Sequence, residues 1–102
     1  METLNTYYQD ENPAEVNPII DALFNEIERN SASIAKKEAY IDEQIEYLKK
    51  ALNADSDQHI KREAIKGTKE RIDYALQLID ELAARNDALM DAVWTVRENL
   101  HK

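Results

Sequence analysis

The sequence predicts an all-α protein, an antiparallel hairpin of two long helices that dimerises into a four-helix bundle. Three observations support this fold class. The 102-residue chain has one glycine and two prolines, so residues that break helices are rare. Apolar residues recur at alternating spacings of three and four, the period of a coiled-coil seam. A single polar segment near residues 54–56 interrupts this pattern.

The N-terminal segment, residues 1–12, is polar and has no helical period, so we expect a flexible arm there. Asn12-Pro13 and Asn17-Pro18 each place an N-cap residue before a proline. Proline suits the first helical position, where its missing N–H group costs nothing. Either pair is a candidate start for the first helix, which we assign to about residues 13–53.

The first helix carries a seam that keeps its alternating step through ten positions, of which eight are large and apolar. The seam consists of Ile20, Phe24, Ile27, Ser31, Ile34, Glu38, Ile41, Ile45, Leu48 and Leu52. The alternative is a three-helix bundle with a break near Asn30–Ser33, where a serine could cap a new helix. We favour one continuous helix because the step does not change at this segment.

The second helix is expected at about residues 57–100, after a turn at about 54–56. Asp55 followed by Gln58 resembles a capping box, which places the helix cap at Asp55. Its seam consists of Ile65, Thr68, Ile72, Ala75, Ile79, Leu82, Asn86, Leu89, Val93, Val96 and Leu100. Because the connection is short, the two helices should pack as antiparallel neighbours.

Polar residues interrupt both seams, at Ser31, Glu38 and Asn86. A polar residue in a seam lowers stability but excludes other alignments, so we interpret these three as residues that fix register and specificity. The alternative is that the seam loosens between Ser31 and Glu38 to admit a side chain from a partner protein.

The register follows from the position of the turn. It places Ser31 near Ile79, and it places Glu38 near Ile72 with Lys69 and Arg71 within reach. An unpaired buried carboxylate is very costly, so we expect Glu38 to pair with one of these bases or to reach solvent.

A two-helix hairpin leaves more apolar surface than one neighbouring helix can cover. The expected partner-interface residues are Leu76, Ala83, Met90, Trp94, Tyr40 and Tyr47. A homodimer forming a four-helix bundle would cover them, and so would helices from another protein. The sequence therefore predicts a non-enzymatic protein–protein interaction module, acting as a scaffold, adaptor or chaperone-like hairpin.

The formal net charge of −8 argues against a general nucleic-acid-binding protein. Acidic residues are concentrated near the N-terminus and include Asp10, Glu11, Glu15 and Asp21. This acidic surface supports the alternative function, an inhibitor that blocks a nucleic-acid-binding site on its target.

Residues that would carry chemistry are sparse. The chain has no cysteine and two histidines, and we find no phosphate-binding loop, no metal-ligand pattern and no catalytic set. We therefore expect no enzyme activity, no cofactor and no small-molecule substrate. No signal peptide or membrane-spanning run is visible, so we expect a cytoplasmic protein that does not enter a membrane.

Overall fold

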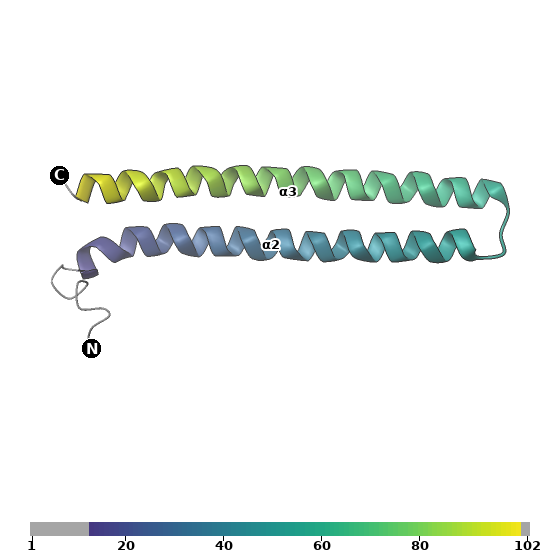
Figure 1. Cartoon of the computed structure of the whole chain (residues 1–102), viewed down its shortest axis with the longest axis horizontal. Helices are drawn as coiled ribbons and strands as arrows, with labels where there is room; N and C mark the ends of the chain where they lie inside the picture. The colour runs from purple at the N-terminus through teal and green to yellow at the C-terminus, as the bar shows by residue number, and fades with distance from the viewer. Residues whose placement is uncertain (1–12, 101–102) are drawn as a thin grey trace.

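The computed structural model describes residues 13–100, with side chains from residue 18, as two helices joined by one turn (Figure 1). Helix α2 spans Pro13–Asn53 and helix α3 spans Gln58–Leu100. The two helices run antiparallel and side by side, which confirms the predicted all-α hairpin. The expected arm at residues 1–12 lies outside the described residues.

Helix α2 is continuous over its 41 residues, so the break near Asn30–Ser33 of the three-helix alternative does not occur. Of the two candidate starts, the helix begins at Pro13 and includes Pro18. At 1.5 Å per residue, a helix of 41 residues is about 62 Å long, which agrees with a long molecular axis of 70 Å.

The turn differs from the sequence prediction in its cap. Asp57 caps α3, because its Oδ1 accepts a hydrogen bond of 2.9 Å from the backbone N–H of Ile60. The prediction that Asp55 is the cap was wrong. Asp57 directly precedes the first helical residue, where a short carboxylate side chain reaches an otherwise unpaired N–H group of the first turn.

Few side chains are fully buried between the two helices. Among the described residues, the buried apolar side chains are Ala64, Ala75 and Val93, and the buried polar ones are Asn30 and Thr68. The other residues of the contact are half-buried. The hairpin is only one helix thick, with extents of 70 × 27 × 13 Å, so both of its broad faces remain open.

Helix α2 presents a different flank to α3 from the one that its seam predicts. One row belongs to both the predicted and the observed contact, and its residues are half-buried. This central row consists of Ile20, Ile27, Ile34, Ile41 and Leu48. Phe24, Ile45 and Leu52, which the seam placed inward, are exposed. The row beside α3 instead contains Asn30 and Gln44, whose side chains bond to residues of α3.

The register also differs, by one heptad. Ser31 lies at Asn86, to which it is hydrogen-bonded, and not at Ile79. The reason is visible in Figure 1, where α3 begins beyond the end of α2, so the turn does not lie midway between the facing residues. Glu38 is exposed, and the described residues contain no ion pair between it and Lys69 or Arg71.

Candidate interaction surfaces

A polar cluster at mid-length joins the two helices. Asn30 Nδ2 donates a hydrogen bond of 2.9 Å to Asn86 Oδ1, and Asn86 Nδ2 donates one of 3.3 Å to Ser31 Oγ. The Asn30 side chain is 7% exposed, so its amide depends on Asn86 for a partner. Two of the predicted register residues, Ser31 and Asn86, are thus brought together, and a register shift would break both bonds.

A second polar contact lies nearer the turn. Arg71 Nε donates a hydrogen bond to Gln44 Oε1, and the Arg71 guanidinium lies 5.6 Å from the centre of the Tyr47 ring. Arg71 Nη2 also donates a hydrogen bond of 3.4 Å to Thr68 Oγ1. One arginine therefore ties α3 to α2 by hydrogen bonding and by a cation–π contact.

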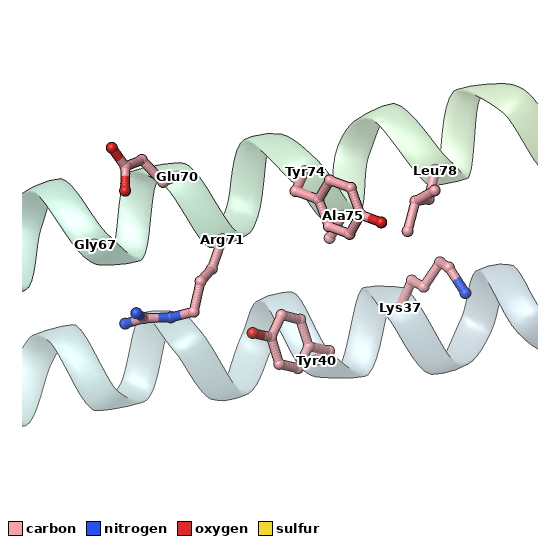
Figure 2. A pocket seen from close by; sticks show the side chains of 8 residues that line it. All are labelled: Lys37, Tyr40, Gly67, Glu70, Arg71, Tyr74, Ala75 and Leu78. Carbon is pink, nitrogen blue, oxygen red and sulfur yellow. The ribbon is translucent and has the colours of Figure 1, made fainter.

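The face that contains this arginine is lined by tyrosines, and we call it the tyrosine face: Tyr40, Tyr47 and Tyr74, together with Ile60. All four side chains are exposed. A groove of about 460 Å³ lies between the helices here, with Lys37 and Tyr40 from α2 opposite Arg71, Tyr74 and Leu78 from α3 (Figure 2). Gly67 and Ala75 also line it, and their lack of bulk leaves the space open.

The opposite face is aliphatic. We define the aliphatic face by its exposed apolar residues Phe24, Ile45, Leu52, Ile65 and Leu76. The Ser31–Asn86 bond lies on this side, because Ser31 shares the heptad row of Phe24 and Ile45, and Asn86 shares that of Ile65. The helix pair therefore leaves two open faces of different chemistry.

The six predicted partner-interface residues do not form one surface. Leu76, Ala83 and Met90 follow one heptad row of α3 beside the aliphatic face, and Leu76 is 46% exposed. Tyr40 and Tyr47 belong to the tyrosine face. Trp94 is exposed, with the Arg97 guanidinium 5.2 Å from its ring centre. Its heptad position points away from the contact with α2.

Ion pairs do not link the two helices within the described residues. The ion pairs among the described residues, Glu26–Arg29, Glu46–Lys49 and Lys69–Asp73, all lie within one helix. The hydrogen bond from Lys69 to Asp73, 2.9 Å long, raises the pKa of the lysine above its ordinary value. Lys69 is thus engaged with its own helix, and the observed register places Glu38 level with Leu78, nine residues away from Lys69.

The predicted acidic surface is only partly described. Asp10 and Glu11 lie outside the described residues, and the side chain of Glu15 is not described. Asp21 is exposed on α2.

Sequence reasoning missed Asn30 and Gln44, which bond across the helix pair, and it expected Arg71 to be available to Glu38, whereas Arg71 bonds to Gln44. A signal was present, because Asn30, Lys37 and Gln44 repeat at seven-residue spacing beside the central isoleucine row. A repeated polar row beside an apolar one indicates the outer edge of a helix–helix contact.

The side chains that the structure describes contain no cluster of three or more acidic or histidine residues that could hold a metal ion. Neither helix of the described chain combines the length and apolar character needed to span a membrane. No family model matches the chain, and comparison with curated proteins and with solved structures gives no match. The features of this chain that bear on function are therefore the tyrosine face and the aliphatic face.

Proposed function

We propose that this protein is a non-enzymatic interaction module, a helical hairpin that packs against a second layer of helices and so acts as a scaffold or adaptor. The second layer is another copy of the chain or a helical partner. The observation that supports the proposal is the imbalance between buried and exposed apolar side chains. Among the described residues, three apolar side chains are buried, whereas twelve large ones are exposed.

The arrangement of these exposed side chains matters more than their number. Single apolar residues on a surface are ordinary, but continuous patches mark interaction sites. Here Ile45 and Leu52 are one heptad apart on α2, and so are Tyr40 and Tyr47. Rows of this kind fit the ridges of another helix, which is how helices recognise helices.

Sedimentation equilibrium from about 1 to 100 µM, a range around the micromolar affinities of modest interfaces, tests the proposal. We expect a mass that rises toward twice the 11.8 kDa of one chain. Because association stabilises the folded state by mass action, the melting temperature should also rise with protein concentration. A strictly monomeric species with a concentration-independent melting temperature would contradict self-association, the form of the proposal that this experiment addresses.

A further inference from the structure

We propose that the aliphatic face binds a second copy of this chain about a two-fold axis that runs parallel to the helices. In this dimer α2 of each copy packs over α3 of the other, and both turns lie at the same end of a four-helix bundle. The inference rests on the proposed function and specifies the face, the occupant and the arrangement.

The larger apolar rows of both helices point toward the aliphatic side. On the aliphatic side of the helix contact, α2 contributes Phe24, Ile45 and Leu52, and α3 contributes Ile65, Ile72, Ile79 and Val93. On the tyrosine side, the equivalent rows are mixed. They contain Asn30, Lys37 and Gln44 with Leu23 and Ala51 on α2, and Arg71 and Arg85 with Ala64, Leu78 and Ala92 on α3. In a four-helix bundle the apolar rows face the centre and polar residues border each helix pair on the outside. The hairpin is therefore arranged as one half of a bundle whose centre lies on the aliphatic side.

The charges that border the aliphatic face differ between the two helices. Each helix has a heptad row that borders the aliphatic face and would meet the second copy. On α2 this row carries three acids and one base, Asp21, Glu28, Asp42 and Lys49, and on α3 it carries three bases and no acid, Arg62, Lys69 and Arg97. All seven are exposed. Packing α2 over α3 of the other copy places the mainly acidic border against the basic one.

The other two-fold arrangement has its axis perpendicular to the helices. It packs α2 on α2 and α3 on α3, with the turns at opposite ends. Acidic borders would then face each other, and so would basic borders, and like charges brought together across an interface oppose binding. The charges therefore favour the axis parallel to the helices.

One oppositely charged pair of the two borders, Asp21 and Arg97, is level between the copies. A rotation about an axis parallel to the helices does not move residues along it, so the register within one chain also applies between chains. Asp21 lies nine residues before Asn30, and Arg97 lies eleven residues after Asn86, the partner of Asn30. At 1.5 Å per residue, Asp21 and Arg97 of opposite copies are level to within about 3 Å.

The arrangement can be measured with one spin label per chain. The chain has no cysteine, so Asp55→Cys in the exposed turn gives a single labelling site. Pulsed electron–electron double resonance on the dimer should give a label separation of about 20–30 Å, since neighbouring helices lie about 10 Å apart. Turns at opposite ends would give about 60 Å, the length of the 41-residue helix at 1.5 Å per residue.

The face is tested by matched substitutions. Ile45→Lys places a charge on the aliphatic face, in the row that points to the centre of the bundle, and should raise the dimer dissociation constant at least tenfold. Tyr40→Lys places the same charge on the tyrosine face, where the residue is about as exposed (38% against 40%), and should change the constant less than twofold. Circular dichroism confirms that each variant is helical.

The charge pairing is tested by a swap. Asp21→Arg and Arg97→Asp should each raise the dimer dissociation constant roughly tenfold, because each substitution changes two symmetry-related contacts. The double variant restores the opposite charges with their sides exchanged and should return to within about threefold of the wild-type constant, given the small energies of exposed ion pairs.

A label separation near 60 Å, or a dimer weakened by Tyr40→Lys and not by Ile45→Lys, would overturn this inference and leave the proposed function intact. A chain that remains monomeric at every concentration would overturn the inference as well as self-association. The label separation and the substitutions therefore separate failure of the arrangement from failure of the proposed function.

Discussion

The tyrosine face and the aliphatic face lie on opposite sides of the same two helices, and they differ in what they leave uncovered. On the tyrosine face, Arg71 already reaches across to Gln44 and Tyr47, and Asn30 reaches Asn86. On the aliphatic face, the residues beside the helix contact are mostly exposed aliphatic side chains without polar partners. Within one chain, therefore, the polar side of the helix contact is complete and the apolar side is not.

This difference explains why the hairpin can be specific without a large core. Hydrogen bonds, most of them on the tyrosine side, fix the alignment of α2 and α3, which the thin apolar contact alone would define poorly. The apolar side is then free to supply binding energy to a second layer, because apolar burial is the main favourable term in association. Substitutions that act on one face and not on the other test this division.

The largest effect is expected for Asn86→Ala, which removes the one side chain that bonds toward both faces. It deletes two hydrogen bonds and leaves the buried Asn30 amide without its partner. The free energy of unfolding should fall by about 2–3 kcal/mol, as measured by urea denaturation at fixed protein concentration.

Two further variants sharpen that measurement. Ser31→Ala removes only the longer bond on the more exposed aliphatic side and should cost about 0.5 kcal/mol. Replacing Asn30 and Asn86 together by leucine leaves no unpaired amide, so stability should recover to the wild-type level or above. A cost below about 1 kcal/mol for Asn86→Ala would show that the cluster does not hold the helices together.

The polar cluster also shows how far the sequence predicts the structure. The central row from Ile20 to Leu48 was identified correctly, because its residues are apolar at every seventh position. The flanking row was not, because Phe24, Ile45 and Leu52 are more apolar than Asn30, Lys37 and Gln44. Periodicity selects the row with the largest apolar area, and in this hairpin that row faces the open side.

The register error has a different physical origin. A four-residue connection between Asn53 and Gln58 limits the distance between the helix ends but not how far one helix extends past the other. That offset is set by side-chain contacts such as Asn30 with Asn86. Ser31 and Asn86 were recognised as register residues, but that they contact one another follows from the register and could not be read from either helix alone.

The next largest effect is expected for a substitution of Glu38, the acidic residue in the α2 row that contains Phe24 and Ile45. In the proposed dimer the two copies of this carboxylate approach each other near the two-fold axis, which opposes association. Glu38→Leu should therefore lower the dimer dissociation constant by about tenfold or more, since a repelled and partly desolvated charge is replaced by an apolar contact. Sedimentation equilibrium measures the constant.

The matched control is Glu70→Leu, which changes the same charge beside the groove of the tyrosine face. It should leave the dissociation constant unchanged. Equal effects of the two substitutions would mean that net charge, and not position on the aliphatic face, governs association.

A smaller effect, of opposite sign to Asn86→Ala, is expected for Gly67→Ala on the tyrosine face. Alanine favours a helix over glycine by about 1 kcal/mol. The added Cβ would lie 3.2 Å from Arg71 Nη1, the end of a flexible side chain that can move by a few tenths of an ångström. We expect the free energy of unfolding to rise by about 1 kcal/mol with the dimer constant unchanged. A loss of stability would show that Arg71 cannot move without breaking its contacts to α2.

The smallest effect is expected for Lys69→Met, on the basic border of the aliphatic face. Hydrogen bonding to Asp73 raises the pKa of Lys69 above its ordinary value of 10.5. The pair therefore adds to stability at neutral pH, and its contribution is lost as the pH rises through the raised value in the folded state. Because the pair is exposed, the substitution should leave the melting temperature of the dilute chain unchanged within error.

The dimer dissociation constant should be more sensitive to the loss of Lys69 than the melting temperature is. Lys49 lies nineteen residues after Asn30 and Lys69 lies seventeen residues before Asn86, so these two lysines of opposite copies are level to within about 3 Å in the proposed dimer. Lys69→Met removes this contact between like charges and should lower the dissociation constant about twofold to threefold at low salt, and less at high salt. Lys66→Met removes an equally exposed charge from a row that does not border the aliphatic face, and it should have no such effect. Identical results for the two lysines at low salt would mean that Lys69 does not lie opposite Lys49 of the other copy, and they would contradict the proposed register between copies.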